Sequence, residues 1–402
     1  MPWKKVNPMD EKITFVHLAK SGRFTMTELC YDFDISRKTG HKYLNRYELY
    51  GAKGLHELSR APHKNAKCTD NEIVKLILKT RRAHTTWGGK KLYHILHDDY
   101  GVESPPCIAT INNLLKRHGL VKPKRRTPGA YPVSPSDLTQ AEYPNHVWTI
   151  DFKGWFTLGD AVQCEPLTVK DLCSKFMIGI RAQDNQQYKY TTRSFRCMAR
   201  ANGIPRILRA DCGSPWASTG LGRLSRFSVH LIEQGVAIEF TRPGHPQDNG
   251  SHERMHRDLK AEATIPPSKN LRAQQRRFDR WVHTYNYKRP HEALGGKRPG
   301  QVYHPSEKRL GEKVKIRYPK NYIKKQVSQS GFIAFEGKNY YAGEHFAHCT
   351  FGLYENEQNQ VEVHYANLHL GNLAYDCEGG RFRPTAYIAP LRRKSLDKPN
   401  PK

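Results

Sequence analysis

The apolar residues of the first part of the chain recur with the period of a helix. Over residues 9–50 they form three short groups, which predict three helices. The third helix is predicted over 37–50, with Ser36 as its N-cap and Gly51 at its end. Two helices joined by a tight turn, the second basic at its start, are the arrangement of a helix-turn-helix. We therefore predict a first helix-turn-helix DNA-binding domain over residues 1–60.

A second unit of the same kind follows over residues 61–121. Amphipathic segments at 70–83, 90–100 and 108–118 predict three further helices. The two units share this arrangement but not their sequence. We predict a second helix-turn-helix domain here, followed over 122–145 by a basic, Pro-rich linker that can lie along a phosphate backbone.

After residue 145 the pattern changes to strands that alternate with helices. Apolar, β-prone runs predict strands at 147–156, 164–169, 176–182, 206–210 and 236–240. Helical periodicity predicts helices at 187–202, 221–234, 249–263 and 270–287. The order is three strands, helix, strand, helix, strand and closing helices. This order predicts an α/β domain over residues 146–305.

Short alternating runs separated by turn residues fill the next segment. They lie at 313–318, 331–335, 338–341, 350–354, 361–365 and 368–375. Their near-regular spacing predicts a small antiparallel β-barrel domain over 312–380. Oligomerisation and DNA contact are both open as its role. The tail at 381–402 is basic, and we expect it to be disordered.

Charge and composition narrow the kind of partner. The chain of 402 residues has a formal net charge of +28, so a polyanion such as nucleic acid is the expected partner. A merely basic, soluble protein is the alternative, and a membrane partner is disfavoured because the cations are spread over several segments. The nine cysteines include no Cys-x-x-Cys pair and no histidine pairs with them at finger-like spacing, which disfavours a disulfide framework and structural zinc. Without an apolar leader or a membrane-length apolar run, we expect a soluble cytoplasmic protein.

Three acidic residues stand out because of their settings. Asp151 ends an apolar run, Asp211 follows another and precedes a turn, and Glu253 opens a helical stretch. Such carboxylates can converge in an α/β fold and hold hard divalent cations against phosphate. Each alone has an ordinary explanation as a turn former or a partner of a helix dipole. Asp248 and Glu239 compete for the third position but are less well placed, in a loop and inside a strand.

The segments around these carboxylates match a known family. They are Trp148-Thr149-Ile150-Asp151-Phe152-Lys153-Gly154-Trp155, Pro166-Leu167-Thr168-Val169, Arg242-Pro243-Gly244-His245-Pro246-Gln247-Asp248-Asn249-Gly250, Glu253-Arg254-Met255-His256-Arg257 and, further on, Tyr285-Asn286, Arg289-Pro290-His291-Glu292-Ala293-Leu294-Gly295, Pro299, Tyr303 and Pro305-Ser306. Over nearly its whole length the chain resembles bacterial insertion-sequence transposases of the DDE group, which have a retroviral-integrase-like catalytic core.

The resemblance implies a multidomain α+β fold with tandem helix-turn-helix modules and a ribonuclease-H-like core. It implies two Mg²⁺ (or Mn²⁺) ions per site, bridged by Asp151, with Asp211 and Glu253 each holding one. The enzyme would bind terminal inverted repeats of double-stranded DNA, nick them to free 3′-hydroxyls and join these to target DNA. It would act as a homo-oligomer, a dimer or larger, on the bacterial nucleoid.

Twelve basic residues are candidates for DNA contact. Those on the predicted helix at 37–50 are Arg37, Lys38, Lys42 and Arg46, the last three on one face. Arg257 and Lys260 follow Glu253 on one helix face, and the resemblance places them against the DNA end. A structural Glu–Arg pair is the alternative there. The other candidates are Lys90, Lys91, Lys116, Arg117, Arg125 and Arg126.

Three features depart from retroviral integrases or from the family. The spacing between Asp211 and Glu253, 41 residues, is longer than in retroviral integrases, as in one bacterial branch. Cys212 stands where the family usually has Asn in an Asp-Asn-Gly turn, and Lys170 is unusual at its position. Asn249 is expected to cap the helix that carries Glu253.

Two alternative functions stay open. One is a catalytically decayed transposase acting as a DNA-binding repressor. The other is an RNA–DNA hybrid nuclease, which is disfavoured because such enzymes rarely need two helix-turn-helix modules.

Overall fold

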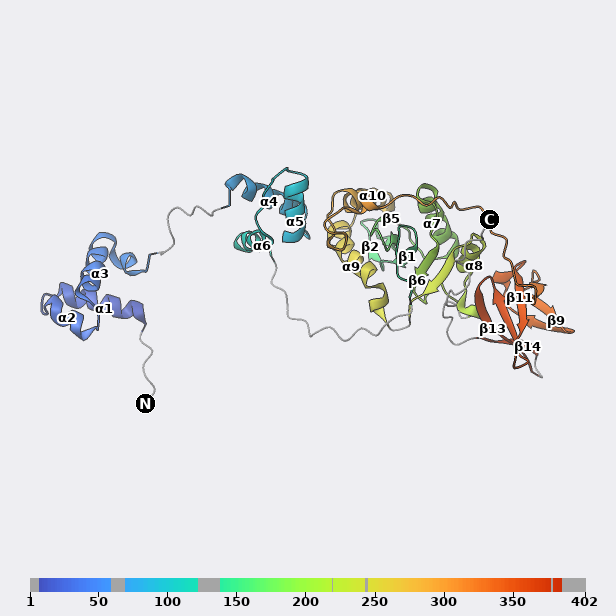
Figure 1. The fold of residues 1–402 in the computed structure, drawn as a ribbon. Coiled ribbons are helices and arrows are strands. Elements are labelled where there is room, and N and C mark those ends of the chain that lie inside the picture. The colour runs from blue at the N-terminus through green and yellow to red at the C-terminus, as the bar shows by residue number, and fades with distance from the viewer. Residues whose placement is uncertain are drawn as a thin grey trace, which may run out of the picture. The chain divides into compact units, whose positions relative to one another are not determined.

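The computed structural model describes residues 7–58, 69–121, 138–218, 220–242, 245–376 and 379–384 (Figure 1). Its contacts divide the chain into two units, Met1–Thr69 and Asp70–Lys402, and each is described by itself. Most of the predicted linker lies outside the described residues, and with it Arg125 and Arg126. The predicted tail lies outside them from residue 385 onward.

The first unit contains three helices, α1 (Pro8–Lys20), α2 (Met26–Asp32) and α3 (Arg37–Tyr50). Each begins at a polar residue, because the side chains of Asn7, Thr25 and Ser36 accept hydrogen bonds from backbone N–H groups of the first turn. The apolar faces of the three helices meet around Phe15, Val16, Leu29, Cys30, Tyr43 and Leu55. Arg37, Lys38 and Lys42 lie outside this small core and are exposed.

The second unit begins with the helices α4 (Asn71–Ala83), α5 (Gly89–Asp98) and α6 (Ile108–Arg117). Their apolar faces meet around Ile77, Leu92, Leu96, Ile111 and Leu115. Gly89 permits a close approach of α5 to α6, since a Cβ atom there would lie 2.6 Å from the side-chain oxygen of Asn112. Two sets of three helices therefore precede the central sheet.

A five-stranded mixed sheet forms the centre of the second unit, in the order β5-β4-β1-β6-β7 (Figure 1). Its strands are β1 (Val147–Phe152), β4 (Leu167–Asp171), β5 (Met177–Arg181), β6 (Ile207–Ala210) and β7 (Ala237–Phe240). The pairs β1–β4 and β4–β5 are antiparallel, and the pairs β1–β6 and β6–β7 are parallel. An antiparallel half followed in sequence by a parallel half is the ribonuclease-H-like order, so the predicted core fold is confirmed.

Helices cover both faces of this sheet (Figure 1). The helices α7 (Tyr188–Asn202) and α8 (Arg226–Glu233) pack on one face, and α9 (Gly250–Leu259) and α10 (Leu271–Tyr287) pack on the other. Side chains of β1 and β4 alternate between the two. Trp148, Ile150, Leu167 and Val169 join the apolar cluster under α7 and α8. Thr149, Thr168 and Lys170 bond to α9 instead, so the face toward α9 is polar.

Among the helices that the structure describes, α10 is the longest, with 17 residues. Phe278, Trp281 and Tyr285 on this helix pack with Met177 and Ile180 of β5. Charged residues occupy its outer face. In the described part of the chain, none of the helices combines the length and the apolar character that crossing a bilayer requires.

Four of the predicted core elements have different bounds. The strand predicted at 164–169 is divided into a short strand, Gln163–Cys164, and β4. The predicted strand at 147–156 ends at Phe152, and Gly154 turns the chain with a φ of 81°. The next residues form a small hairpin of β2 (Phe156–Thr157) and β3 (Gln163–Cys164). The predicted helix at 221–234 starts at Arg226, after a 3₁₀ turn. The helix predicted over 249–263 changes at Lys260 from α9 to a π-helical turn, Lys260–Thr264.

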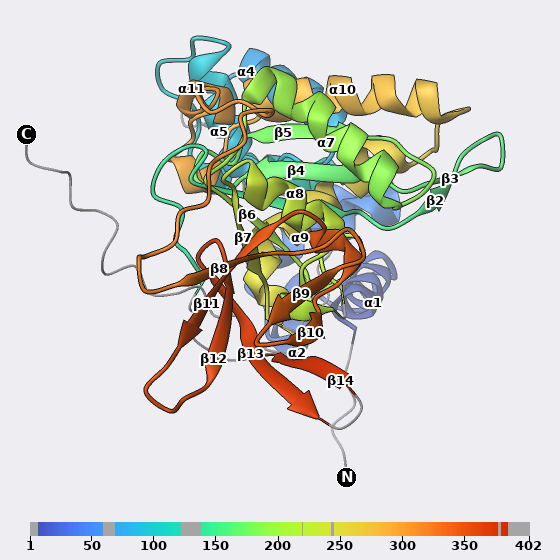
Figure 2. The ribbon, with the colours of Figure 1, turned by 90° about the vertical axis from the view of Figure 1, so that its right-hand side faces the viewer.

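A seven-stranded sheet follows, in the order β8-β11-β12-β13-β14-β10-β9 (Figure 2). Its strands are β8 (Ile323–Gln326), β9 (Phe332–Phe335), β10 (Lys338–Tyr341), β11 (Thr350–Glu355), β12 (Val361–Tyr365), β13 (Leu368–Asp376) and β14 (Gly379–Pro384). Its pairs are antiparallel as predicted, except that β10 and β14 run parallel. β14 lies partly within the predicted tail, which therefore begins too early.

The predicted strand at 313–318 is wrong. The N–H group of Val314 donates to the carbonyl oxygen of Glu233 at 2.8 Å, and Ile316 packs against the core of the second unit. The segment therefore lies against the end of α8 and, among the described residues, pairs with no strand. Alternating apolar residues have the same pattern in a strand and in an extended segment that packs on a helix.

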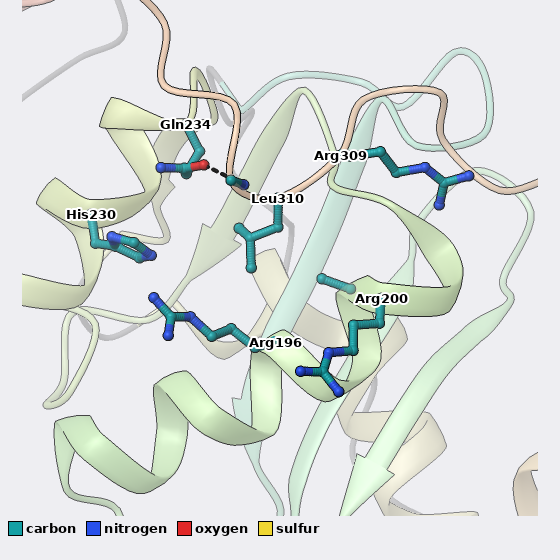
Figure 3. Close-up of a pocket in the computed structure, with 8 residues that line it drawn as sticks. Arg196, Arg200, His230, Gln234, Arg309 and Leu310 are labelled. Carbon is teal, nitrogen blue, oxygen red and sulfur yellow. Dashed lines mark hydrogen bonds between the residues drawn. The ribbon is translucent and has the colours of Figure 1, made fainter.

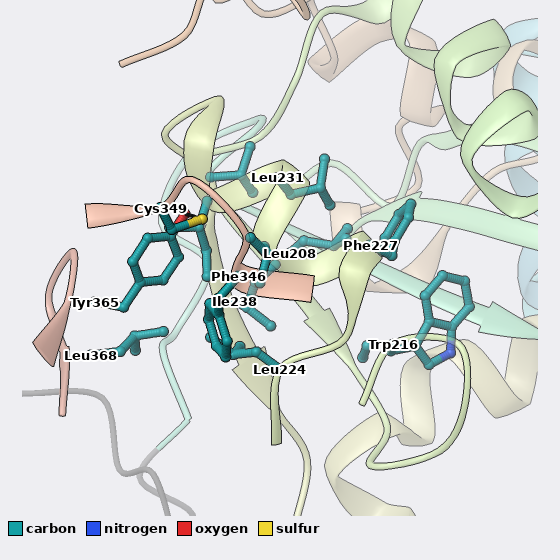
Figure 4. Close-up of a cluster of buried hydrophobic side chains, with 14 of the residues drawn as sticks. Leu208, Trp216, Leu224, Phe227, Leu231, Ile238, Phe346, Cys349, Tyr365 and Leu368 are labelled. Carbon is teal, nitrogen blue, oxygen red and sulfur yellow. Dashed lines mark hydrogen bonds between the residues drawn. The ribbon is translucent and has the colours of Figure 1, made fainter. Parts of the chain in front are cut away.

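One continuous apolar cluster joins the seven-stranded sheet to the central sheet (Figure 4). Phe346, Tyr365 and Leu368 from the C-terminal segment belong to the same cluster as Leu231 of α8 and Ile238 of β7. Phe346 is fully buried and contacts the Phe351 and Tyr365 rings edge-on. One surface of the C-terminal sheet is thus used for packing within the chain.

Candidate active site

Three acidic residues lie near one another at one edge of the central sheet. Asp151 lies near the end of β1, Asp211 directly follows the parallel neighbour β6, and Glu253 is in the first turn of α9. Burial raises the pKa of Asp151 to about 7, and the negative charges of Asp211 and Glu253 add to this shift. Such an effect requires the carboxyl groups to be neighbours. The structure therefore brings the three predicted carboxylates together.

A buried hydrogen-bond network supports Asp151 from the side of α9. The hydroxyl group of Thr168 donates to the backbone carbonyl oxygen of Asp151 at 2.9 Å. The same oxygen atom of Thr168 lies 2.6 Å from Nε2 of His252 and 2.8 Å from Nε2 of His256. Oγ1 of Thr149 lies 2.7 Å from Nδ1 of His252. The network ties two strands to one face of the helix that carries Glu253.

Both histidines of this network are neutral at neutral pH. Burial lowers the pKa of His256 to about 3, with help from the charges of Lys153 and Lys170. Burial also lowers the pKa of His252 well below its usual range. No role was predicted for either histidine from the sequence. Their spacing of four residues on one helix, opposite Thr149 and Thr168, was the available signal.

Asn249 occupies the predicted N-cap position of α9, but its side chain does not cap the helix. Its Nδ2 group donates to Oδ2 of Asp151 at 3.3 Å. Its Oδ1 atom is buried and has no hydrogen-bond partner within the described part of the chain. Asn249 therefore orients the Asp151 carboxylate, a role that its position before a helix did not indicate.

The two competing carboxylates, those of Asp248 and Glu239, form ion pairs with other residues. Asp248 forms a two-pronged ion pair with Arg242, with N–O distances of 2.9 and 2.7 Å, and its side chain is only 2% exposed. Glu239 pairs with Arg209 at 2.6 Å and accepts the backbone N–H of Thr139 at 2.8 Å. Both carboxylates are satisfied by these partners. The preference for Glu253 over them agrees with this geometry.

The turn after Asp211 is closed without an Asn residue. The N–H group of Gly213 donates to Oδ1 of Asp211 at 3.1 Å. The thiol of Cys212 donates to the carbonyl oxygen of Thr241 at 3.2 Å. Burial raises the pKa of Cys212, which keeps the thiol protonated. The turn therefore has its own hydrogen bonds despite the departure from the family pattern.

Lys170, the other unusual residue, lies under the start of α9. It is 3% exposed, and its Nζ group donates to the carbonyl oxygen of Ser251 at 3.1 Å and to its hydroxyl oxygen at 2.9 Å. Burial lowers its pKa to about 7, and the charges of Lys175 and Arg254 act in the same direction. Lys170 thus joins β4 to the helix that carries Glu253.

The predicted DNA contacts fall into three groups. The exposed side chains are Arg37, Lys38, Lys42, Lys90, Lys116, Arg117, Arg257 and Lys260; Arg46 and Lys91 are half-buried; Arg125 and Arg126 lie outside the described residues. Lys90 forms an ion pair with Glu292. Burial, and after it the charge of Lys260, lowers the pKa of Lys153, whose own charge acts on Asp151. The nearest acidic partner of Arg257 is Asp258, at 4.0 Å, and not Glu253.

A basic hollow of about 850 Å³ lies beside α9. Its cationic lining residues are Lys90, Lys91, Lys170, Lys175, Arg254, Arg257 and Arg289, and its acidic ones are Asp258 and Glu292. The excess of positive charge suits a polyanion rather than a metal ion. This hollow adjoins the helix that carries Glu253.

A second hollow, of about 390 Å³, lies between α7, α8 and the segment that follows α11 (Pro299–Val302), as Figure 3 shows. Arg196, Arg200, Arg309 and His230 line it, and Gln234 accepts the N–H of Gly311 at 2.7 Å beside it. None of the three converging carboxylates lines this hollow. It is therefore separate from the candidate active site.

The donor set at the candidate active site fits hard divalent cations. Carboxylate oxygens are the ligands that Mg²⁺ and Mn²⁺ prefer. Burial, and after it the negative charges of Asp211 and Glu253, disfavours the ionised form of Asp151 and raises its pKa. A bound cation would relieve this repulsion.

The comparisons with known proteins point to one class. Residues 141–246 and 234–299 match models of the integrase core domain. An uncharacterized 31.7 kDa protein of insertion element IS407 from Burkholderia multivorans is 26% identical over 249 residues, which cover 61% of this chain and 84% of that protein.

Similar solved structures are retroviral. The HTLV-2 integrase catalytic core domain in complex with magnesium (trimeric form) is 14% identical, with a TM-score of 0.31, and covers 41% of this chain and 100% of that one. The simian T-cell lymphotropic virus intasome in complex with PP2A regulatory subunit B56 gamma is 15% identical, with a TM-score of 0.35, and covers 79% of this chain and 97% of that one. At these TM-scores neither likeness carries an argument, and the fold is established by the topology of the sheet.

The topology and the family match define an integrase core domain at residues 141–299. The predicted resemblance of the chain to insertion-sequence transposases with such a core is confirmed.

Proposed function

We propose that this protein is a metal-dependent DDE transposase that cleaves DNA strands and transfers them to a target. The observation that carries the proposal is the convergence of Asp151, Asp211 and Glu253 at one edge of an integrase core domain. The net charge of +28 and the exposed basic residues of α3 and α9 support a polyanionic substrate.

Two Mg²⁺ or Mn²⁺ ions, when bound, would supply the positive charge that activates an attacking oxygen and stabilises a leaving one. In this proposal Asp151, Asp211 and Glu253 would hold these ions. Thr168 and Asn249 hold the backbone and the carboxylate of Asp151 in place. Water would attack first and free a 3′-hydroxyl. That hydroxyl would then attack target DNA, without a covalent enzyme intermediate.

Substrate recognition is assigned to the helical segments before the core. We propose that α1–α3 and α4–α6 are the two helix-turn-helix domains that bind terminal inverted repeats, with α3 in a major groove. Arg257 and Lys260 would contact the DNA end beside the carboxylates. In this proposal the C-terminal sheet closes into a small barrel, and the protein acts as a homo-oligomer on double-stranded DNA in the bacterial nucleoid.

A catalytically decayed repressor is not favoured. Cys212 was the feature that suggested decay, and the structure shows the Asp211 turn closed by hydrogen bonds. All three carboxylates are present, and the charges of Asp211 and Glu253 act on Asp151.

The test is strand nicking and joining on a DNA carrying the element's ends. Asp151→Asn, Asp211→Asn and Glu253→Gln should each abolish cleavage in Mg²⁺ or Mn²⁺ while DNA binding is kept, and EDTA should stop the parent. Asp160→Asn, at an exposed loop position, is the matched control and should cleave normally. Normal cleavage by any of the three variants would remove that residue from the site.

A further inference from the structure

One nitrogen atom beside Asp151 makes no hydrogen bond to the described residues. Nδ1 of His256 lies 3.9 Å from Oδ2 of Asp151, and the His256 side chain is 12% exposed. Within the described part of the chain, no donor lies within hydrogen-bond distance of this Nδ1.

The hydrogen bonds of the Thr168 hydroxyl group determine which ring nitrogen of His256 carries the proton. A hydroxyl group has one proton and two lone pairs. The carbonyl oxygen of Asp151 can only accept, so the Thr168 proton is used there. Both lone pairs then accept N–H groups, from Nε2 of His252 and Nε2 of His256. A neutral His256 with its proton on Nε2 therefore directs an Nδ1 lone pair at the carboxylate site.

The same count excludes His252 from this role. Its Nε2 atom donates to Thr168, and its Nδ1 atom lies 2.7 Å from the hydroxyl oxygen of Thr149, which donates to it. Both nitrogen atoms of His252 are therefore used inside the protein, and the residue is fully buried. His252 positions the neighbouring groups, whereas His256 keeps one nitrogen available.

We propose that His256 is an additional, nitrogen donor to the metal ion held by Asp151, with Thr168 setting the tautomer in which it can act. The inference rests on the proposed metal-dependent function. Two donors at about 2.1 Å from one ion lie roughly 3.0–4.2 Å apart, and the observed 3.9 Å between Nδ1 and Oδ2 falls within this span. The hydrogen bond from Asn249 leaves further lone pairs on the Asp151 carboxylate.

A nitrogen donor has a consequence for metal choice. Imidazole suits Mn²⁺ better than it suits Mg²⁺, which strongly prefers oxygen ligands. We therefore expect the parent protein to bind Mn²⁺ more tightly than an all-carboxylate site would. His256→Gln should weaken Mn²⁺ binding by about tenfold and Mg²⁺ binding by less.

The test detects the ligand atoms of the bound metal ion directly and needs no DNA. Electron spin-echo envelope modulation of Mn²⁺ bound to the full-length protein should show coupling to ¹⁴N, which His256→Gln removes while Mn²⁺ stays bound. Labelling all histidines with ¹⁵N should shift the modulation without changing any residue, which keeps the test valid if the variant folds poorly. His283→Gln, at an exposed position on α10, is the control and should keep the signal.

The outcomes separate this inference from the proposed function. If Asp151→Asn does not change Mn²⁺ binding, the proposed metal site itself is wrong. If binding depends on Asp151 but the parent shows no nitrogen coupling, or if His256→Gln retains it, the metal site stands and the inference about His256 is overturned. Coupling that disappears in both Asp151→Asn and His256→Gln supports the proposal.

Discussion

Asp151→Asn should stabilise the metal-free protein, by an amount that grows with pH. Burial first, and then the charges of Asp211 and Glu253, raise the pKa of Asp151 from 3.8 to about 7. In the unfolded chain the same carboxyl group ionises near its ordinary value. At a pH between these two pKa values, Asp151 of the folded protein holds a proton that the unfolded chain has released. Its stability therefore falls as pH rises through this window, and the loss is complete above the folded pKa.

The size of this loss of stability follows from the pKa shift of Asp151. About three pKa units, at about 1.4 kcal/mol each, give a penalty of about 4 kcal/mol above pH 7 and about 2 kcal/mol at pH 5. The side chain is 23% exposed, so solvent screening removes a modest part of this. The stability difference between Asp151→Asn and the parent should therefore widen by about 2–3 kcal/mol between pH 5 and pH 8.

Urea unfolding in EDTA, followed by fluorescence of the buried Trp148 and Trp216, measures this difference in the core. The exposed-loop variant Asp160→Asn is the control and should track the parent at both pH values. Adding Mg²⁺ at pH 8 should stabilise the parent and leave Asp151→Asn unchanged, because a cation relieves the same repulsion. Equal pH dependence in the parent and in Asp151→Asn would refute the reasoning.

Three further predictions concern other parts of the chain. Cys212→Asn should keep the fold and preserve or raise Mg²⁺-dependent strand transfer, since either side chain can close the turn; loss of activity present in the parent would show that the thiol is required. In a gel-shift assay, Lys42→Ala should weaken binding to the element's ends by about 1–3 kcal/mol more than binding to random DNA if a base edge is contacted. Equal loss on both DNAs would mean phosphate contact only. Phe346→Ala should destabilise the second unit by about 3–5 kcal/mol through the cavity it leaves, and an unchanged urea midpoint would contradict its place in the shared core.

The strands of the central sheet could be predicted because each is a short apolar run between turn residues. The carboxylates could be placed for a related reason. Asp151 and Asp211 follow two such runs, and a parallel pair of strands ends at the same edge of a sheet. This reasoning needs only local patterns and one rule of topology. It extends to Glu253, whose position after a Gly- and Pro-rich loop marks the first turn of a helix.

The hydrogen-bond network around Asp151 could not be predicted, because its threonines lie within runs that otherwise read as apolar strands. Thr149 and Thr168 are β-prone and were counted within apolar runs, although their alternation with Trp148 and Val169 puts them on the opposite face. Their partners are about 80 to 100 residues away in sequence. The role of Asn249 was missed for a similar reason. A residue before a helix is ordinarily a cap, and only the tertiary fold brings Asp151 within reach of its side chain.

Two sets of residues on α9 have different roles, one in holding the helix against the sheet and one in the candidate active site. His252 and His256 are four positions apart and point toward the sheet, where the two threonines hold them. Glu253 and Arg257 share the same spacing on the exposed side, next to Lys260. Because the two sets lie on one rigid element, the network that fixes the inner face also fixes the carboxylate on the outer face relative to Asp151. A polar contact between helix and sheet stabilises the fold less well than apolar packing would, but it sets the rotation of α9 through directional hydrogen bonds. That rotation decides whether Glu253 reaches the other two carboxylates.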